Sequence, residues 1–273
     1  QSGKRGGIRM GMLEIKGLRK VFGAGTVDEH TALDGIDLDI ERSQFVTVIG
    51  SNGAGKSTLF NAVCGNFPID AGRIMLDGEN ITHRPDYKRA RVIGRLFQDP
   101  MRGSAPGMSI EENLALAAGT GSWLSSIKRS DRQRFREILR ELDMGLEDRM
   151  TQPVGLLSGG QRQALTLMMA TVNPPKLLLL DEHTAALDPA TAEKVLDITK
   201  KTVSEQGLTC MMVTHNMQSA IDLGDRLIMM NKGRIIFDAS GDEKKKLTVP
   251  ALMELFRNAA GESLATDRIL LGE

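Results

Sequence analysis

A glycine-rich segment of this chain has the residue types that bind a polyphosphate. It fits the pattern G-x-x-x-x-G-K-[ST] with the residues Gly50-Ser51-Asn52-Gly53-Ala54-Gly55-Lys56-Ser57-Thr58. In this pattern the glycines let backbone N–H groups converge on a phosphate, the lysine reaches the β- and γ-phosphates, and the first hydroxyl residue can bind Mg²⁺. The segment therefore predicts a nucleoside triphosphate site, with Lys56 as a catalytic cation and Ser57 as a metal ligand.

An acidic pair after an apolar run is the second candidate for chemistry. Leu177–Leu180 predicts a buried strand, and Asp181 and Glu182 follow it directly. Such a strand places its last carboxylate at the carboxyl edge of the sheet, beside the phosphate-binding segment. We expect Asp181 to hold Mg²⁺, directly or through water, and Glu182 to polarise the attacking water. An acidic cap after a core strand is the alternative, but the presence of the glycine-rich segment favours catalysis.

The elements around these residues alternate between strand and helix. Phe45–Ile49 predicts a buried strand, and Leu59–Cys64 predicts a helix that ends at Gly65. This strand–loop–helix order is the context in which the glycine-rich pattern binds phosphate. Later elements are expected as strands at Leu177–Leu180 and Thr209–Val213, helices at 189–206 and Met217–Leu223, a hairpin at Leu227–Phe237 and a terminal helix around Leu252–Phe256. The alternation indicates an α/β fold.

Two other regions differ in pattern from this core. Near the N-terminus, Leu13–Ile15 and Ile36–Ile40 alternate apolar and polar residues and, with Arg73–Leu76, predict an antiparallel β layer. Residues 99–172 are rich in helix signals, including capping boxes at Ser130–Gln133 and Ser158–Gln161. The predicted fold is therefore an α/β P-loop NTPase core with an N-terminal antiparallel β subdomain and an inserted helical subdomain.

The expected domain boundaries follow these changes in pattern. Residues 1–12 are interpreted as a disordered tail or an expression remnant. The ATPase domain is expected at 13–241, with 13–98 and 173–241 as its nucleotide-binding core and 99–172 as its helical subdomain. Residues 242–273 predict a C-terminal helical tail.

Composition excludes several other classes of protein. Lys+Arg and Asp+Glu both number 35, so no basic surface for nucleic acid is indicated. The single Tyr and single Trp argue against a stacking surface for single-stranded nucleic acid. The apolar run at Leu177–Leu180 is too short to span a bilayer, and the two cysteines lack metal-ligand spacing.

Further segments make the pattern specific to one family. In chain order they are Lys20-Val21-Phe22-Gly23, Leu96-Phe97-Gln98-Asp99-Pro100, Leu157-Ser158-Gly159-Gly160-Gln161, Ala185-Ala186-Leu187-Asp188 and Val213-Thr214-His215. Together with the phosphate-binding segment and the acidic pair, they resemble the motifs of ATP-binding cassette (ABC) proteins. The resemblance covers about residues 13–240, and the order and spacing match throughout.

The resemblance implies a role for each of these residues. Phe22 would stack on adenine, Gln98 would contact Mg²⁺ or the γ-phosphate, and His215 would donate a hydrogen bond to the γ-phosphate. Leu157–Gln161, the signature segment, stands at a helix start that can bind an anion. It would close on the γ-phosphate held by a partner subunit. A head-to-tail homodimer around two ATP molecules is therefore expected. The further nucleotide contacts would come from Ser158, Gly159, Gly160, Gln161 and Asp188.

The resemblance also implies membrane partners. The chain would be the ATPase subunit at the cytoplasmic face of the cell membrane, acting with a separate permease and an extracytoplasmic substrate-binding protein. The stretch Asp181–Pro189 resembles an importer group for amino acids, including aromatic ones. The alternatives are a regulatory ABC ATPase that acts on ribosomes or DNA, and the ATPase subunit of a lipid or cell-division exporter.

Two expectations concern contact surfaces. The permease is expected to dock on Gln98–Ser125, with apolar anchors at Phe97, Met101, Met108 and Ile110. The alternative is that these four side chains belong to the core. His183, which follows the acidic pair, is expected near the dimer interface or in solvent.

Overall fold

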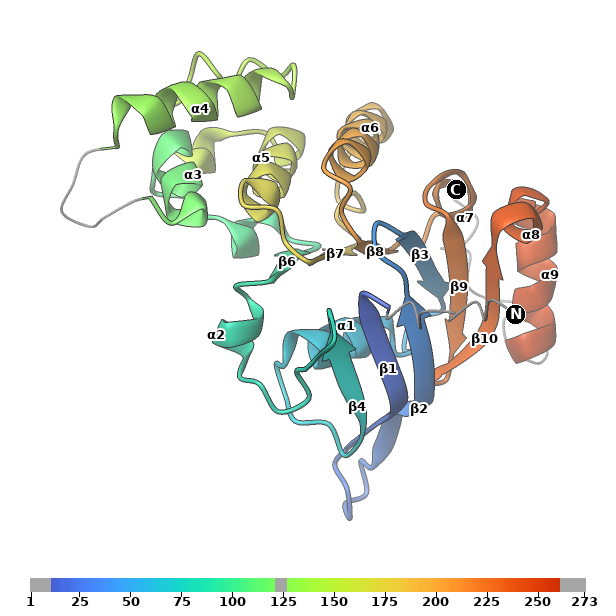
Figure 1. The fold of residues 1–273 in the computed structure, drawn as a ribbon. Coiled ribbons are helices and arrows are strands. Elements are labelled where there is room, and N and C mark those ends of the chain that lie inside the picture. Colours follow the sequence, from blue (N-terminus) through green and yellow to red (C-terminus); the bar gives the residue numbers. More distant parts are fainter. Residues whose placement is uncertain (1–10, 121–126, 261–273) are drawn as a thin grey trace, which may run out of the picture.

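Two β-sheets and a helix packed against both of them form the centre of the molecule (Figure 1). The computed structural model describes residues 11–120 and 127–260. The smaller sheet is antiparallel and has the order β2-β1-β4-β5. Its strands are β1 (Leu13–Phe22), β2 (His30–Ile40), β4 (Ala71–Leu76) and β5 (Glu79–Asn80). The antiparallel layer predicted near the N-terminus is therefore confirmed.

The larger sheet has six strands, in the order β10-β9-β3-β8-β7-β6. All neighbours are parallel except β9 and β10, which form the expected hairpin. The strands are β3 (Phe45–Gly50), β6 (Ile93–Leu96), β7 (Leu177–Asp181), β8 (Cys210–Val213), β9 (Arg226–Asn231) and β10 (Arg234–Ser240). Because β3, β7 and β8 run in the same direction, the segments that follow them emerge at one edge of the sheet.

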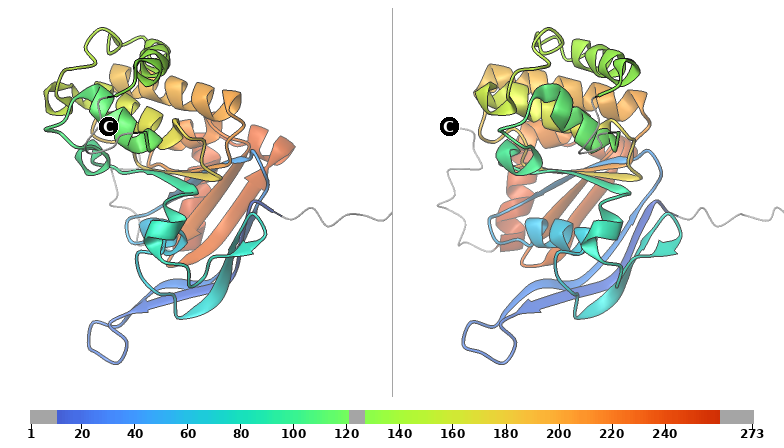
Figure 2. Two further views of the ribbon diagram at one scale, coloured as in Figure 1. Left: turned by 60° about the vertical axis from the view of Figure 1, so that its left-hand side comes forward. Right: turned by 90° about the vertical axis from the view of Figure 1, so that its left-hand side faces the viewer.

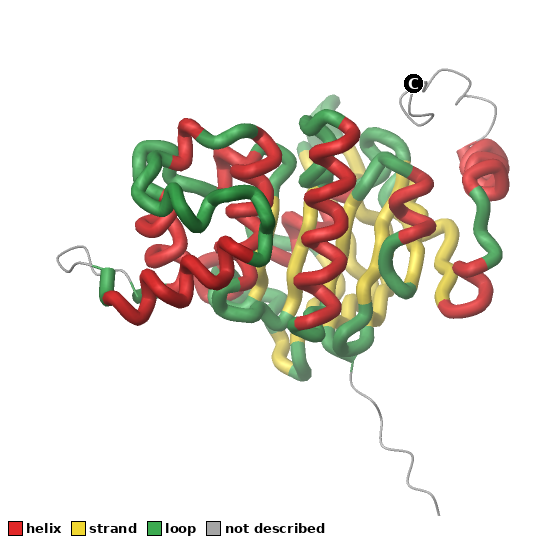
Figure 3. Tube along the Cα trace, turned by 90° about the horizontal axis from the view of Figure 1, so that it is seen from above, coloured by secondary structure: helices red, strands yellow, loops and turns green. Residues whose placement is uncertain are grey.

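Helices cover both faces of the larger sheet, and Figure 3 looks onto one of these faces. On one face, α1 (Lys56–Cys64) packs in the core that the two sheets share. On the other face lie α5 (Gly159–Thr171), α6 (Pro189–Glu205), α7 (Met217–Asp222) and α9 (Val249–Ala260). Strand β7 alternates between these faces, since Leu177 and Leu179 join the first core and Leu178 and Leu180 join the second. Burial on both faces explains its uninterrupted run of leucines.

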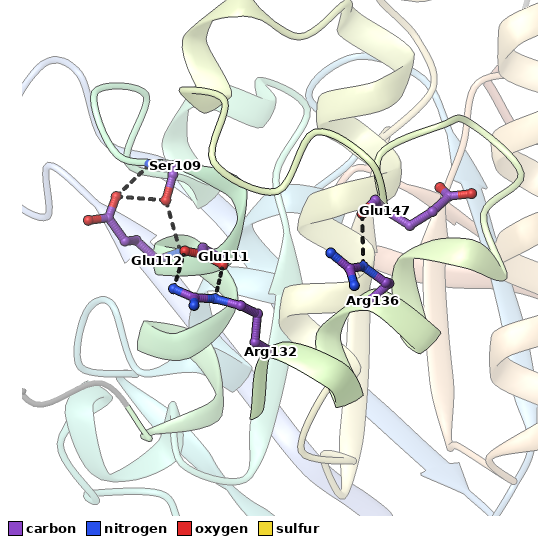
Figure 4. Close-up of polar contacts among 6 residues, drawn as sticks. All are labelled: Ser109, Glu111, Glu112, Arg132, Arg136 and Glu147. Atoms are coloured by element: carbon purple, nitrogen blue, oxygen red, sulfur yellow. Dashed lines mark hydrogen bonds and ion pairs between the residues drawn. The ribbon is translucent and has the colours of Figure 1, made fainter. Parts of the chain in front are cut away.

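Helices α3 (Ile110–Ala118) and α4 (Arg129–Arg140) lie beyond the β6 edge of the sheet and pack against α5 (Figures 1 and 2). Arg132 on α4 donates two hydrogen bonds, of 2.7 and 2.9 Å, to the Glu111 carboxylate on α3 (Figure 4). Ser109 and Glu112 form a capping box at the start of α3, which the sequence analysis missed. The predicted capping box at Ser130–Gln133 is wrong, because α4 begins at Arg129, which places Ser130 inside its first turn and makes Lys128 the N-cap.

Short elements complete the described chain. They are α2 (Asp86–Arg89), α8 (Gly241–Lys245) and the 3₁₀ turns η1 (Pro100–Gly103) and η2 (Val154–Leu156). Three segments lie outside the described residues: 1–10, which belong to the expected N-terminal tail, 121–126, and 261–273. Met12 is buried, and its N–H donates to the carbonyl of Ile40. Within the described part of the chain, no helix combines the length and apolar character that a membrane span needs.

Candidate functional site

The glycine-rich segment turns tightly between the end of β3 and the start of α1. Gly53 and Gly55 have φ angles of 77° and 100°, in the left-handed region that favours glycine. Close packing constrains the loop as well: a Cβ on Gly50 would lie 2.5 Å from the carbonyl oxygen of Met230, and one on Gly55 would lie 2.6 Å from that of Ala32. The backbone therefore requires glycine at these positions for its conformation and for its packing.

Lys56 is folded back onto the loop that carries it. Its ammonium group donates to the carbonyl oxygens of Gly50 at 2.7 Å and Ser51 at 3.0 Å, and the residue is only 6% exposed. Burial lowers the pKa of Lys56, and the negative charges of Glu182 and Asp181 oppose this shift. Within the described part of the chain, this ammonium group donates to neutral carbonyls, so a bound phosphate would give the buried cation a charged partner.

The acidic pair at the end of β7 divides between two partners. Asp181 Oδ2 lies 3.1 Å from Nη2 of Arg95 on β6. Glu182 has a φ of 48°, and its Oε1 lies 2.6 Å from Nε2 of His215, which follows β8. Strands β7 and β8 are parallel neighbours, and this pairing brings Glu182 and His215, which follow them, together.

Two cavities meet at Ser57. The first, of about 250 Å³, is lined by Phe22, Glu182 and residues 52–58 of the glycine-rich segment. The second, of about 690 Å³, is lined by Ser57, Gln98, Asp181 and Arg95, among others. The structure therefore brings the predicted adenine and phosphate residues to one cavity and the predicted metal ligands to the next.

The oxygen donors of the second cavity fit Mg²⁺. A serine hydroxyl, an amide oxygen and a carboxylate are the hard ligands that this ion accepts, and all three types face the same space. In residues 11–120 and 127–260, no group of three or more His, Cys, Asp or Glu side chains could hold a metal ion. A mixed set of Ser57, Gln98 and Asp181 is therefore the candidate.

Phe22 combines an exposed ring with support from behind. The residue is 40% exposed. Its ring packs edge-to-face against Phe67 with centroids 5.3 Å apart, and the Lys20 ammonium lies 5.3 Å from the Phe22 centroid. An exposed ring fixed in this way can stack on a planar base.

The signature segment lies apart from both cavities. Ser158 caps α5 through the predicted box with Gln161, and Asp188 caps α6 by accepting from the N–H of Thr191. Hydrogen bonds from the Thr191 hydroxyl and from its backbone N–H lower the pKa of Asp188. A Cβ on Gly160 would lie 2.0 Å from Cγ2 of Thr191, so the two helix starts touch. None of residues 158–161 is among those that line the two described cavities.

Two residues lie elsewhere than predicted. His183 is 2% exposed and its Nε2 lies 3.1 Å from the hydroxyl of Thr199, so the expectation of a solvent-exposed ring is wrong, and its position near a dimer interface stays a prediction. Burial lowers the pKa of His183 to about 4. Ile110 is fully buried in the core of the helical region, so its predicted role as a docking anchor is also wrong. Conversely, no sequence motif pointed to Arg95, which contacts the predicted metal ligand Asp181.

Comparisons with known proteins identify relatives over nearly the whole chain. A family model described as ABC transporter matches residues 33–185. A tyrosine transport ATP-binding protein of Clostridioides difficile is 43% identical over 250 residues, which cover 91% of this chain and 100% of that protein.

Solved structures give the same result. A dimeric ATP-binding cassette in a post-hydrolysis state bound to ADP and Pi superposes with a TM-score of 0.72 and 28% identity, over 84% of this chain and 98% of that one. The cbiO1 protein of Clostridium perfringens, part of the ABC transporter complex cbiONQ, gives a TM-score of 0.73 and 27% identity, over 95% of this chain and 97% of that one. The predicted fold class is confirmed.

Proposed function

The chain belongs to the ABC transporter family of ATP-binding, ATP-hydrolysing cassettes, and we propose that it drives an importer of amino acids, with tyrosine as the first candidate substrate. The full-length match to a tyrosine transport ATP-binding protein carries this proposal. The stretch Asp181–Pro189, which resembles amino-acid importers, supports the same substrate class. A lipoprotein-releasing ATP-binding protein of Ruegeria, which bears on the exporter alternative, is 35% identical over 230 residues, below the 43% of the tyrosine transport protein.

In this proposal the residues of the two cavities, together with His215, have separate roles in binding and hydrolysing ATP. Phe22 stacks on adenine, the backbone N–H groups of residues 50–58 surround the β-phosphate, and Lys56 moves from its carbonyl partners to the β- and γ-phosphates. Ser57, Gln98 and Asp181 would hold Mg²⁺, which neutralises phosphate charge when bound. Glu182 polarises the attacking water, and His215 donates to the γ-phosphate once its contact with Glu182 opens.

A second copy of the chain completes the site. Ser158, Gly159, Gly160 and Gln161 are separate from the phosphate-binding cavity of their own subunit, yet they form a capped helix start that can bind an anion. We propose that two copies pair head-to-tail, so that this helix start in each copy, with the neighbouring Asp188, meets the γ-phosphate held by the other.

The assembly we propose lies at the cytoplasmic face of the membrane. The ATPase dimer binds separate permease subunits, and an extracytoplasmic binding protein delivers the amino acid. The absence of a spanning helix from the described residues agrees with a separate permease. Docking is proposed on the described part of Gln98–Ser125, where Met101 is an exposed apolar side chain.

Uptake by reconstituted vesicles tests this function. The chain is co-expressed with the permease and binding protein encoded beside it, and uptake of labelled tyrosine, phenylalanine and xylose is compared with ATP inside the vesicles. The proposal expects ATP-dependent uptake of tyrosine and none of xylose. Uptake of the sugar alone would refute the substrate class, and a complex that exports lipid would refute the importer assignment.

A further inference from the structure

Arg95 joins the candidate metal site to two neighbouring elements. It lies on β6, the edge strand beside β7, and its guanidinium reaches the end of β7. Nη2 donates to Asp181 Oδ2 at 3.1 Å and Nη1 donates to the Asn61 side-chain oxygen on α1 at 2.7 Å. The same Asn61 oxygen accepts from Asn66 at 2.9 Å, which fixes its direction. The guanidinium is therefore held between α1 and the carboxylate.

This ion pair shares its carboxylate with the candidate metal. The cavity that holds Ser57, Gln98 and Asp181 is also lined by Arg95. The side chains of Arg95 and Asp181 are 12% and 14% exposed, so water screens their charges weakly. A divalent cation at this carboxylate would lie next to a fixed positive charge.

The other face of the guanidinium contacts the segment that leads to Gln98. Cζ of Arg95 lies 4.7 Å from the centroid of the Phe97 ring, and Cζ of Arg102 on η1 lies 5.7 Å from the same ring. Arg95 therefore links the carboxylate of Asp181 with the start of the Gln98–Gly103 segment.

We propose that Arg95 is a positioning residue of the metal site, whose charge limits how strongly Asp181 draws Mg²⁺ to bound nucleotide. This inference rests on the proposed role of Asp181 as the metal carboxylate. With Arg95 present, one oxygen of Asp181 already has a cationic partner. Without it, a nearly buried carboxylate loses its hydrogen-bonded cationic partner, and a divalent cation binds there more strongly. Loss of the arginine charge should therefore increase the amount by which Mg²⁺ strengthens nucleotide binding.

The experiment measures the dissociation constant of a non-hydrolysable ATP analogue by calorimetry, once with Mg²⁺ and once with EDTA. The dissociation constant in EDTA divided by the one in Mg²⁺ gives the metal contribution to binding. A general loss of structure weakens binding in both conditions and leaves this ratio unchanged. Arg95→Met and Arg95→Gln should raise this ratio roughly three- to tenfold, as the removal of a weakly screened neighbouring charge requires. Arg95→Lys keeps the charge and should stay within about twofold of the parent.

Two controls separate the possible failures. Arg91→Met removes an exposed arginine of the same segment and should leave the ratio unchanged. Asp181→Asn should lower the ratio; if it does not, the proposed metal carboxylate is itself wrong. If Asp181→Asn lowers the ratio while folded Arg95→Met and Arg95→Gln leave it unchanged or lower it, only the role of Arg95 is refuted.

Hydrogen exchange gives a second measurement in the same variants. Arg95→Met removes the guanidinium from the Phe97 ring, so backbone amides of Gln98–Gly103 should exchange faster than in the parent. Arg95→Lys should preserve most of the protection. Unchanged exchange in Arg95→Met would refute the link between the carboxylate and this segment.

Discussion

Nε2 of His215 lies 2.6 Å from Oε1 of Glu182, so the two residues proposed to act on the γ-phosphate and on water contact each other directly. A carboxylate accepts hydrogen bonds, so Nε2 is the protonated nitrogen in this contact. Both side chains are largely buried. The contact satisfies them before ATP binds, and a γ-phosphate then offers His215 an alternative acceptor with more negative charge.

Glu182→Gln should preserve ATP binding and reduce hydrolysis by about 100-fold or more, because an amide cannot take a proton from water. The amide oxygen still accepts from Nε2 of His215, so the local packing is retained. An ATP-bound dimer should then accumulate, visible by size-exclusion chromatography with ATP and Mg²⁺. A monomeric variant that hydrolyses ATP at the parent rate would show that Glu182 is not the catalytic group.

Lys56→Ala should weaken ATP binding or hydrolysis by about 100-fold, because it removes the cation that faces the β- and γ-phosphates. Binding is measured by calorimetry and hydrolysis by phosphate release. Lys16→Ala is the matched control, since Lys16 is an exposed lysine on β1. Parent-like turnover in Lys56→Ala would overturn the phosphate-site assignment.

Most strands and helices could be predicted from local sequence, and contacts between distant segments could not. Local capping signals were less reliable, since Ser130 is not an N-cap and the box at Ser109 was missed. The capping box at Ser158 and the cap at Asp188 involve residues only three positions apart, and both are present. The ion pair between Arg95 and Asp181 joins residues 86 positions apart, and only the parallel pairing of β6 with β7 brings them together. No spacing rule in one sequence reports such a contact.

The wrong predictions have a related cause. A solvent-exposed His183 is one expectation for the residue that follows Glu182, but the turn after β7 directs its ring into the subunit, where Thr199 is its partner. Ile110 is predicted as an anchor because it is an apolar residue of the docking segment, but α3 packs its first residue into the helical core. Burial depends on which face of an element meets its neighbour, and that is decided by tertiary packing.

His183 makes the stability of the protein fall in mild acid. Its folded pKa of about 4 lies below the unfolded value of 6.5, so the unfolded chain binds the proton first. Stability is therefore complete above about pH 6.5 and is lost as the pH falls toward 4. Between pH 7.5 and pH 5 the loss from this residue should be about 2 kcal/mol.

Urea unfolding at both pH values measures this loss. Thr199 donates its own proton to the Val195 carbonyl, so it accepts from Nε2 of His183, and a glutamine amide can replace that donor. His183→Gln should remove about 2 kcal/mol of the pH dependence. His83→Gln changes an exposed histidine and should not. An unchanged pH dependence in folded His183→Gln would contradict the prediction.

The contact between Gly160 and Thr191 predicts a suppressor pair. A Cβ at residue 160 would lie 2.0 Å from Cγ2 of Thr191, so Gly160→Ala should reduce stability by about 1–3 kcal/mol and move the signature helix from α6. Thr191→Ser removes that methyl group and keeps the backbone N–H that Asp188 accepts from. The double variant should recover most of the thermal stability and, in a Glu182→Gln background, the ATP-dependent dimer. Equal stability of Gly160→Ala and the double variant would show that this contact is not limiting.

Met101 is the best remaining anchor for the permease. It is 41% exposed, and its sulfur accepts a hydrogen bond from Nη1 of Arg162 at 2.8 Å. Met108 is half-buried, so a charge there could disturb folding and would not test docking alone. Met101→Glu instead places a carboxylate next to the guanidinium of Arg162. Met101→Glu should therefore leave folding and the isolated subunit's ATPase activity intact.

Transport measured with the reconstituted permease decides the role of this surface. A buried carboxylate at an apolar contact is costly, so Met101→Glu should abolish or strongly reduce ATP-driven uptake. Ile236→Glu is the control, because Ile236 is an exposed apolar residue on β10, at the opposite edge of the six-stranded sheet from β6. Normal uptake with Met101→Glu would place the docking surface elsewhere. Equal losses in both variants would show a general effect of surface charge, because the proposed docking surface includes Met101 and not Ile236.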